Sequence, residues 1–305
     1  MCYGAGRVGP VRFDAFPHLI GSSCAGGVPV VIADRVVIAP EERRQAVLDV
    51  IRGARRRLGL TIFRCNDQGI VDELRRAIDR GVEVDVLLTR RASGWRKRLD
   101  DLHDELIRMG AQVTRHGPRA TKHHAKYIVA DSGPLLVASF NLTRRCLTRT
   151  CDFAVVTWEP GAVTDAWRLF DADLARRRLP AVASAHTRLI VGPEWAGSAV
   201  RSLLRGATRR IAIIDHKLDE PRVRRILAKK AGEGVEVVHH ASRVVSGLEA
   251  HGKLLIVDRR VALVGSLALS APSLGLRREL SLLVQAPAAV RRLEAFFTAA
   301  VGGRG

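Results

Sequence analysis

The sequence predicts an α/β protein built from two similar α/β sandwich halves that are related by a pseudo-twofold axis. Two observations predict this fold class. The first is an internal repeat in which strand-like apolar runs and helix-like stretches follow each other in the same order in each half. The second is a motif of polar residues that occurs once in each half, with corresponding members 127 positions apart.

The first half is expected to occupy residues 41–179, after an N-terminal extension of residues 1–40 that matches nothing in the repeat. An apolar run is followed by a stretch in which apolar residues recur about every 3.6 residues, which is typical of a helix. This stretch ends in Gly-Val-Glu-Val, which indicates a helix cap followed by a strand. The predicted elements are a strand at 58–63, a helix at 71–79, and strands beginning at 81, at 127–129 and at 135–140.

The second half, residues 180–305, repeats this order. Its predicted elements are a strand at 211–214, a helix at 222–230, and strands beginning at 234, at 254–257 and at 261–264. The Arg-rich stretch 176–180, which ends in Pro, predicts the boundary between the halves. The charged segment 93–109 has a helical pattern and no clear counterpart in the second half.

The composition indicates a substantial core and a large excess of positive charge. The chain has 305 residues, of which 47% are hydrophobic, and a formal net charge of +19. Such an excess favours polyanionic partners, either nucleic acid phosphates or an anionic lipid surface. Only seven of the 50 basic residues are Lys, however, and Arg occurs in almost every segment, so most of these charges are expected on solvated helix faces.

The sequence contains no clear signal for a cofactor or for a membrane span. The five cysteines lack paired C-x-x-C spacing, which predicts neither a disulfide framework nor a zinc site. No apolar stretch approaches the roughly 20 residues that span a bilayer. We therefore expect a cytoplasmic or peripheral membrane protein without a cofactor, while a lipoprotein-like stretch at Leu19–Cys24 leaves export open.

The motif H-x-K-x4-D occurs twice, in the same register. Its members and the residues that follow them in register are His124, Lys126, Asp131, Ser139 and Asp152 in the first half, and His251, Lys253, Asp258, Ser266 and Glu279 in the second. The offset of 127 holds without insertion over 28 residues, which indicates a duplicated structural unit. No other histidine in the chain has Lys at the second position after it.

The spacing of the motif suits chemistry at a phosphate. Side chains at positions i and i+2 of a strand share a face, so His124 and Lys126 are expected to point one way and Ala125 the other. The same reasoning applies to His251 and Lys253. A pseudo-twofold axis would place the histidines on opposite sides of one phosphate, where one attacks phosphorus and the other protonates the leaving alkoxide. The lysines would neutralise the non-bridging oxygens, so no metal is expected at the site.

At these residues the sequence resembles the phospholipase D superfamily, in which H-x-K-x4-D, a G-S-x-N-like stretch and an acidic residue occur in each of two halves. The resemblance covers about residues 42–300 and implies a phospholipase D-like fold. Ala138-Ser139-Phe140-Asn141 matches the stretch with Ala in place of Gly, and Gly265-Ser266-Leu267-Ala268 matches it with Ala in place of Asn. The missing Asn amide at Ala268 predicts an asymmetric site.

The resemblance also implies a role for each residue. Each histidine would be oriented by an acid from the opposite half, His124 by Glu279 and His251 by Asp152. The residues expected to bind substrate are Ser139, Asn141 and Ser266, and those expected to be structural are Asp131 and Asp258.

The resemblance implies a phospholipase D-like phosphodiesterase that cleaves or transfers phosphatidyl groups through a phosphohistidine intermediate. The expected partner is a phospholipid at an anionic membrane surface, and the catalytic site is complete in one chain. The alternative is a metal-independent nuclease of the same superfamily, which the net charge of +19 favours and the aromatic content of 5% disfavours, because few rings are available for base stacking. A third hypothesis, an inactive binding scaffold, is opposed by the presence of both His-Lys pairs and both acids.

Three further interpretations concern neighbours of the motif. His124 is assigned as the nucleophile, because Asn141 beside Ser139 gives the first half the fuller set of hydrogen-bonding groups. His123 is expected to point to the opposite face and to be structural. Trp95, among the basic residues of 90–98, lies either in a substrate-binding or membrane-surface loop or on an exposed helix face.

Overall fold

The apolar strands of the first half form a seven-stranded sheet with the order β1-β8-β6-β5-β2-β3-β4. The computed structural model describes residues 34–116, 122–177 and 187–302. The strands of this first sheet are β1 (Arg35–Val37), β2 (Arg57–Ile62), β3 (Glu83–Thr89), β4 (Gln112–His116), β5 (Tyr127–Ala130), β6 (Leu135–Ala138) and β8 (Ala154–Thr157).

The second half forms a six-stranded sheet with the order β11-β10-β14-β15-β16-β9. Its strands are β9 (Leu189–Gly192), β10 (Arg210–Ile214), β11 (Glu236–His240), β14 (Leu254–Val257), β15 (Val261–Gly265) and β16 (Glu279–Val284). A small third sheet joins the halves, in the order β12-β13-β7, from β7 (Thr150–Cys151), β12 (Val244–Val245) and β13 (Leu248–Ala250).

The two large sheets repeat one topology. Read from β1 and from β9, six strands follow in equivalent order, with β2 and β3 parallel as β10 and β11 are, and the other equivalent pairs antiparallel. The prediction of two similar α/β halves is therefore confirmed. Helix α3 (Arg96–Arg108) and strand β4 belong to the first half alone, in agreement with the unmatched charged segment.

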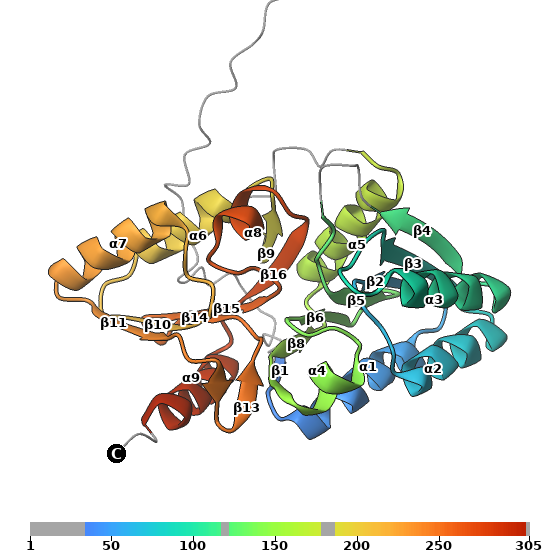
Figure 1. The fold of residues 1–305 in the computed structure, drawn as a ribbon, viewed down its shortest axis with the longest axis horizontal. Coiled ribbons are helices and arrows are strands. Elements are labelled where there is room, and N and C mark those ends of the chain that lie inside the picture. The colour runs from blue at the N-terminus through green and yellow to red at the C-terminus, as the bar shows by residue number, and fades with distance from the viewer. Residues whose placement is uncertain (1–33, 117–121, 178–186, 303–305) are drawn as a thin grey trace, which may run out of the picture. The chain divides into compact units, whose positions relative to one another are not determined.

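Helices lie on the faces of the two large sheets (Figure 1). Three groups of buried apolar side chains pack these helices against the sheets. One face of the first sheet packs against α1, α2 and α3, and one face of the second packs against α6, α7 and α8. The remaining faces share a core with α5 and α9. The helices not yet delimited are α1 (Pro40–Gly53), α2 (Gln68–Asp79), α4 (Arg144–Thr148), α5 (Pro160–Leu174), α6 (Ala196–Arg205), α7 (Pro221–Gly232), α8 (Ala271–Gly275) and α9 (Pro287–Gly302).

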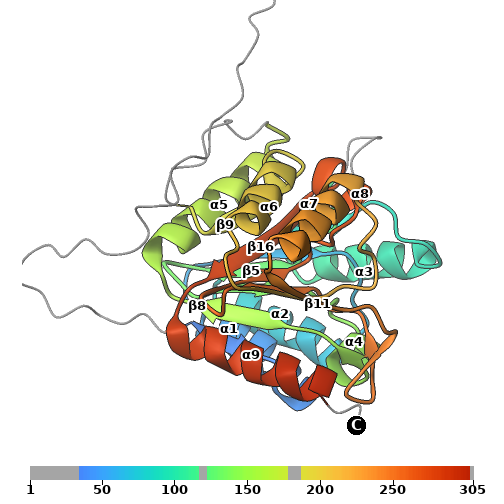
Figure 2. The same ribbon diagram turned by 90° about the vertical axis from the view of Figure 1, so that its left-hand side faces the viewer.

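Helix α9, drawn in red at the lower left of Figure 2, contacts strand β1 and the first turn of α1. Arg292 of α9 donates to the backbone oxygen of Val36 in β1 and pairs with Glu42 of α1. The described residues from 34 onward belong to one compact unit, so these contacts join the two halves within a single body.

The structure differs from the sequence-based expectation at two places. Residues 35–37, placed in the N-terminal extension, form β1, the equivalent of β9; a three-residue strand is too short to show a period. Residues 124–126 and 251–253, expected in strands, lie outside the strands, directly before β5 and β14 begin. Residues 1–33 of the expected extension and residues 178–180 of the expected boundary lie outside the described residues. None of the helices in the described parts of the chain is long and apolar enough to cross a bilayer.

Candidate active site

Each His-x-Lys segment is held by backbone bonds to the opposite half. His124 donates its N–H to the carbonyl of Arg278 at 2.8 Å, and Arg278 donates to the carbonyl of Lys122 at 3.0 Å. On the other side, His251 and Gly252 both donate to the carbonyl of Cys151, at 3.3 and 2.7 Å. Arg278 directly precedes Glu279, and Cys151 directly precedes Asp152. These backbone bonds therefore bring each histidine next to the acid of the opposite half.

Gly252 allows one of these close approaches. A Cβ at this position would lie 2.8 Å from the Cα of Asp152, the carbonyl oxygen of Cys151 and the ring of Phe153. Two of these atoms are backbone and have no room to move aside. The x of the second H-x-K therefore has to be Gly for His251 to lie against Asp152.

The two histidines contact the acids of the opposite halves. The Nδ1 of His124 lies 2.9 Å from an Oε atom of Glu279, and the Nδ1 of His251 lies 2.9 Å from an Oδ atom of Asp152. An ionised carboxylate accepts only, so each Nδ1 carries the hydrogen and each neutral ring has its lone pair on Nε2. Both rings are thereby prepared to attack or to exchange a proton through Nε2.

The lysines of the motif lie beside the histidines and are buried. Lys126 Nζ lies 3.1 Å from His124 Nε2 and donates to the His124 carbonyl at 2.8 Å. Lys253 Nζ likewise donates to the carbonyl of His251. The i and i+2 side chains therefore lie together although the segments are not strands.

The pKa values of both histidines are lowered, but burial and the neighbouring charges contribute in different proportions. Burial, together with the Lys126 ammonium, lowers the pKa of His124 to about 3 in spite of Glu279. For His251 the largest influence is the Asp152 carboxylate, which raises the pKa, but burial and Lys253 outweigh it and leave the pKa below its ordinary value. His124 is thus firmly neutral, while His251 has the stronger support for a proton.

The pKa values of the charged partners are also shifted. Burial lowers the pKa of Lys126 to about 7, against the attraction of Glu279. Burial alone would raise the pKa of both acids, but His251 lowers that of Asp152 to about 2, and His124 lowers that of Glu279 to about 2. The site therefore contains two stable carboxylates facing two histidines.

The serines of the two G-S-x-N-like stretches form hydrogen bonds within the protein next to the acids, and their expected contact with substrate stays a prediction. Ser139 Oγ donates to Asp152 at 2.6 Å and accepts the N–H of Phe153 at 2.9 Å. Ser266 Oγ accepts the N–H of Leu280 at 3.1 Å. Both serines are at most 1% exposed, so their hydroxyls are engaged by the protein itself.

Three supporting residues were missed by the sequence analysis. Ser273 donates to Glu279 at 3.0 Å and Thr150 to Asp152 at 2.5 Å. The offset of 127 that relates the two motifs also relates Cys146 to Ser273, so extending the alignment of the two halves could have drawn attention to Ser273. The third, Arg43 on α1, is 1% exposed and donates to the carbonyls of the loop before Asp152; no motif marks it. Its acceptors are the backbone oxygens of Ile38, Cys146, Thr150 and Asp152.

The asymmetry expected at Asn141 and Ala268 is present in the contacts. Asn141 Nδ2 lies 3.9 Å from Cys146 Sγ, and its buried Oδ1 has no hydrogen-bond partner among the described residues. The N–H of Ala268 instead donates to Ser273 Oγ at 2.9 Å. Asn141 thus leaves one polar atom uncommitted in the first half.

Asp131 and Asp258 lie away from the histidines and hold turns. The Asp131 carboxylate accepts the N–H groups of residues 55–57 at 2.7 to 2.9 Å, and Asp258 accepts those of residues 208–210 at 2.7 to 3.2 Å. These bonds lower the pKa of both carboxyls despite some burial. Their contacts agree with the structural role implied by the resemblance.

Basic and aromatic side chains surround the histidines on the first-half side. The Phe63 ring meets His124 edge-on at 4.8 Å, and Lys122 Nζ lies 4.8 Å from the centre of the Phe63 ring. Arg64 stacks between Phe63 and Trp95, at 5.4 and 5.5 Å from the ring centres. Trp95 is half-buried at the start of α3 and packs against the core of the first half, so it does not lie on an exposed helix face.

Four cations of this region form a basic rim, defined as Arg64, Lys122, Lys217 and Arg277. Burial lowers the pKa of Lys122, and the other three cations add to the effect. Mutual repulsion of this kind is relieved when an anion binds. A group of cations of this kind favours the binding of anions.

One group of potential metal ligands lies within the site itself. Ligand atoms of Cys146, Asp152 and His251 lie within 4.8 Å of one another. Asp152 is already bonded through both oxygens to His251 and through one each to Ser139 and Thr150. This carboxylate is consequently committed to orienting the histidine.

Comparisons with known proteins give one family and a set of related folds. The family model described as "Cardiolipin synthase, PLD-like domain" matches residues 47–174 and 188–301. No curated protein matches the sequence. The Porphyromonas gingivalis polyphosphate kinase structure is similar with a TM-score of 0.71 and 19% identity, over 86% of this chain and 46% of that one. The Haemophilus influenzae phosphatidylserine synthase has a TM-score of 0.66 and 14% identity, over 86% and 85%.

A smaller structure matches about one half of the chain. Nuc from Salmonella typhimurium, a phospholipase D family member, has a TM-score of 0.44 and 21% identity, over 48% of this chain and 97% of that one. At these identities the similarities describe the fold alone. The chain spans less than half the length of the polyphosphate kinase that it matches.

Proposed function

The chain belongs to the phospholipase D-like family described as cardiolipin synthase, PLD-like domain, and from this membership we propose that it cleaves or transfers phosphatidyl groups of phospholipids through a phosphohistidine intermediate. The observation that carries the proposal is the crossed pairing of each histidine with the acid of the opposite half, His124 with Glu279 and His251 with Asp152. Phosphodiester chemistry is common to the superfamily, and the substrate that we propose for it here is a phospholipid.

In the first step, His124 Nε2 attacks phosphorus. The N–P bond forms as the bond from phosphorus to the leaving oxygen breaks, and His251 donates its Nε2 proton to that oxygen. Glu279 stabilises the positive charge that develops on the attacking ring. The ammonium groups of Lys126 and Lys253 face the non-bridging oxygens and take the role that a metal has in other phosphoryl-transfer sites.

In the second step, His251 acts as the base. It removes a proton from water or from an alcohol, whose oxygen then attacks phosphorus and breaks the N–P bond. His124 returns to its neutral state and His251 to its protonated state. Water as the acceptor gives hydrolysis, and a glycerol-type hydroxyl gives transfer.

The basic rim favours an anionic lipid over a zwitterionic one. Phosphatidylcholine carries a quaternary ammonium that the rim would repel, whereas phosphatidylglycerol does not. The name of the Haemophilus phosphatidylserine synthase, whose fold this chain shares, also points to phospholipids. We therefore expect phosphatidylglycerol to react faster than phosphatidylcholine.

The test is turnover of phosphatidylglycerol vesicles, phosphatidylcholine vesicles and single-stranded DNA in an assay without added metal, with His124→Ala as the blank. Lys217→Ala removes a rim charge and should slow phosphatidylglycerol turnover more than phosphatidylcholine turnover. Lys229→Ala, whose side chain is 78% exposed on α7, is the matched control and should change neither rate. Faster cleavage of DNA than of any phospholipid would make the nuclease the better assignment.

A further inference from the structure

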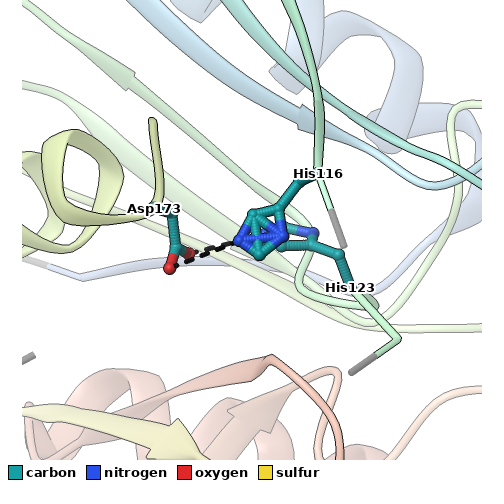
Figure 3. Close-up of side chains that lie close together, drawn as sticks. All are labelled: His116, His123 and Asp173. Carbon is teal, nitrogen blue, oxygen red and sulfur yellow. Dashed lines mark ion pairs between the residues drawn. The ribbon is translucent and has the colours of Figure 1, made fainter. Parts of the chain in front are cut away.

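A second cluster of titratable side chains lies behind the motif. It is formed by His116, the last residue of β4, by His123, next to His124, and by Asp173 near the end of α5 (Figure 3). All three are buried, with exposures of 8%, 1% and 2%. None of the steps proposed above uses them.

The distances in the cluster are too long for hydrogen bonds. His116 Nε2 lies 3.7 Å from Asp173 Oδ1, and His123 Nε2 lies 3.5 Å from Asp173 Oδ2. Hydrogen bonds between nitrogen and oxygen span about 2.7 to 3.2 Å. Ligands of a tetrahedral ion with bonds of about 2.0 to 2.2 Å are separated by roughly 3.3 to 3.6 Å, close to the two distances here.

Several polar atoms of the cluster have no other partner. Among the described residues, both ring nitrogens of His123, the Nδ1 of His116 and the Oδ2 of Asp173 are buried without a hydrogen bond. Buried polar atoms in native proteins are nearly always satisfied by protein, water or an ion. The two imidazole rings are also close, with centres 4.4 Å apart, and ligand atoms of the three residues lie within 4.8 Å of one another.

Asp173 also pairs with a cation of the protein. Arg278 Nε lies 3.1 Å from Asp173 Oδ1, and the same guanidinium pairs with Glu194. With both imidazoles neutral, Asp173, Glu194 and Arg278 together carry one negative charge, and the Arg176 cation, which also acts on His116, balances it. Arg278 contacts one oxygen of the Asp173 carboxylate, and the other oxygen faces His123. Carboxylates that bind metal ions are often oriented by a second residue in this way.

We propose that His116, His123 and Asp173 bind one divalent transition-metal ion of the zinc type, in a structural site distinct from the His-Lys site. Two imidazoles and one carboxylate form a typical donor set for such an ion, with water as the fourth ligand. The ion would tie β4, α5 and the segment that carries His124 together from behind. It does not contact the reacting phosphate, so the phosphohistidine chemistry is independent of it.

The experiment is a metal titration of the whole chain without a histidine tag. Dialysis against Zn²⁺ should leave one equivalent bound, and Co²⁺ in its place should give the visible bands of a tetrahedral ion without a thiolate charge-transfer band. His116→Ala and Asp173→Asn, the second nearly isosteric, should each weaken binding at least tenfold. His103→Ala on α3, which removes a histidine that pairs with exposed Asp104, is the matched control and should bind as wild type does.

Three results would overturn the proposal. The first is a folded wild-type protein that binds less than a tenth of an equivalent, and this result needs no variant to fold. The second is unchanged binding in folded Asp173→Asn. The third is a thiolate band, which would place the ion at Cys146 beside His251.

Discussion

At the scale of single residues, the site separates two histidines that the repeated motif by itself leaves equivalent. Both H-x-K segments are related by the same offset, and each histidine has one acid. The surroundings differ: His124 is 16% exposed and lies against the Lys126 ammonium, while His251 is 28% exposed and is dominated by Asp152. We infer that His124 suits attack and His251 suits proton donation.

The pH dependence of kcat/KM should reflect these pKa shifts. His124 has a pKa of about 3, so it stays neutral and no loss is expected between pH 7 and 5. Lys126 has a pKa of about 7 and loses its charge as the pH rises, so the rate should fall above pH 7. For an alkyl leaving group the fall should begin at lower pH, because His251, with a pKa below 6.5, must also retain its proton.

A nitrophenyl phosphodiester isolates the contribution of the lysine. Its leaving group needs no proton, so only the decline near pH 7 should remain. Profiles of the two substrates, measured side by side, check the expectation. A rate that rises from pH 5 to pH 8 would indicate a histidine of ordinary pKa as the attacking group and would contradict this assignment.

Arg43 should be important for stability because its guanidinium satisfies four backbone carbonyls at once. Arg43→Met leaves these acceptors buried without donors, and we expect the free energy of unfolding to fall by about 3 kcal/mol or more. Arg44→Met, at a neighbouring side chain that is 47% exposed, should cost less than about 1 kcal/mol. Denaturant unfolding of the two variants measures the difference, and equal losses would show that the carbonyl contacts contribute little.

At the scale of the elements, the crossed backbone pairing places the acids. β13 runs parallel to β7, which ends one residue before Asp152, and the backbone of residues 122–124 pairs with Arg278, one residue before Glu279. The short helices α4 and α8 precede the two acids in the chain, and Cys146 of α4 and Ser273 of α8 lie at equivalent positions in the two halves. Each half therefore positions the histidine of the other.

Gly252→Ala tests this pairing. The new methyl group would lie 2.8 Å from the backbone of Cys151 and Asp152 and would push His251 away from its acid, so kcat should fall by roughly 100-fold. Gly53→Ala at the end of α1, where no atom lies within 4 Å, is the control and should keep wild-type activity. Circular dichroism separates a shifted site from an unfolded protein. A fully active Gly252→Ala variant would show that the close approach is not needed.

The sequence predicted the repeated elements and the motif because both depend on local periodicity and on a constant offset. It did not show that Ser139 bonds to Asp152 or that Ser266 accepts the N–H of Leu280, because a buried serine and one that binds substrate look alike in sequence. It missed Arg43, whose four acceptors come from segments up to 109 positions away. Contacts of that range appear only when the chain is folded.

At the scale of the whole molecule, both half-sites lie in one chain and in one compact unit. A monomer should therefore be fully active. Mixtures of His124→Ala and His251→Ala should remain as inactive as either variant alone, in a turnover assay over a range of protein concentrations. Recovery of activity on mixing would require a site that spans two chains.

The requirement for metal can be examined on the same scale. Neither proposed step uses an ion, so turnover should persist directly after addition of a chelator. Slow removal of the ion proposed behind the motif should instead lower the midpoint of thermal unfolding. Immediate loss of turnover in a protein that stays folded, with recovery on adding metal, would count against metal-free catalysis.

The central claim, attack by His124, is tested most directly by rapid-quench labelling with a phosphodiester that carries a labelled phosphoryl group and a nitrophenolate leaving group. Wild type should show label on the peptide that contains His124. His251→Ala should form the same adduct and then stall, since no base activates water, and His124→Ala should form none. Label on the peptide that contains His251, in wild type or in His124→Ala, would reverse the two roles, and a fully active enzyme that never carries label would contradict the covalent mechanism.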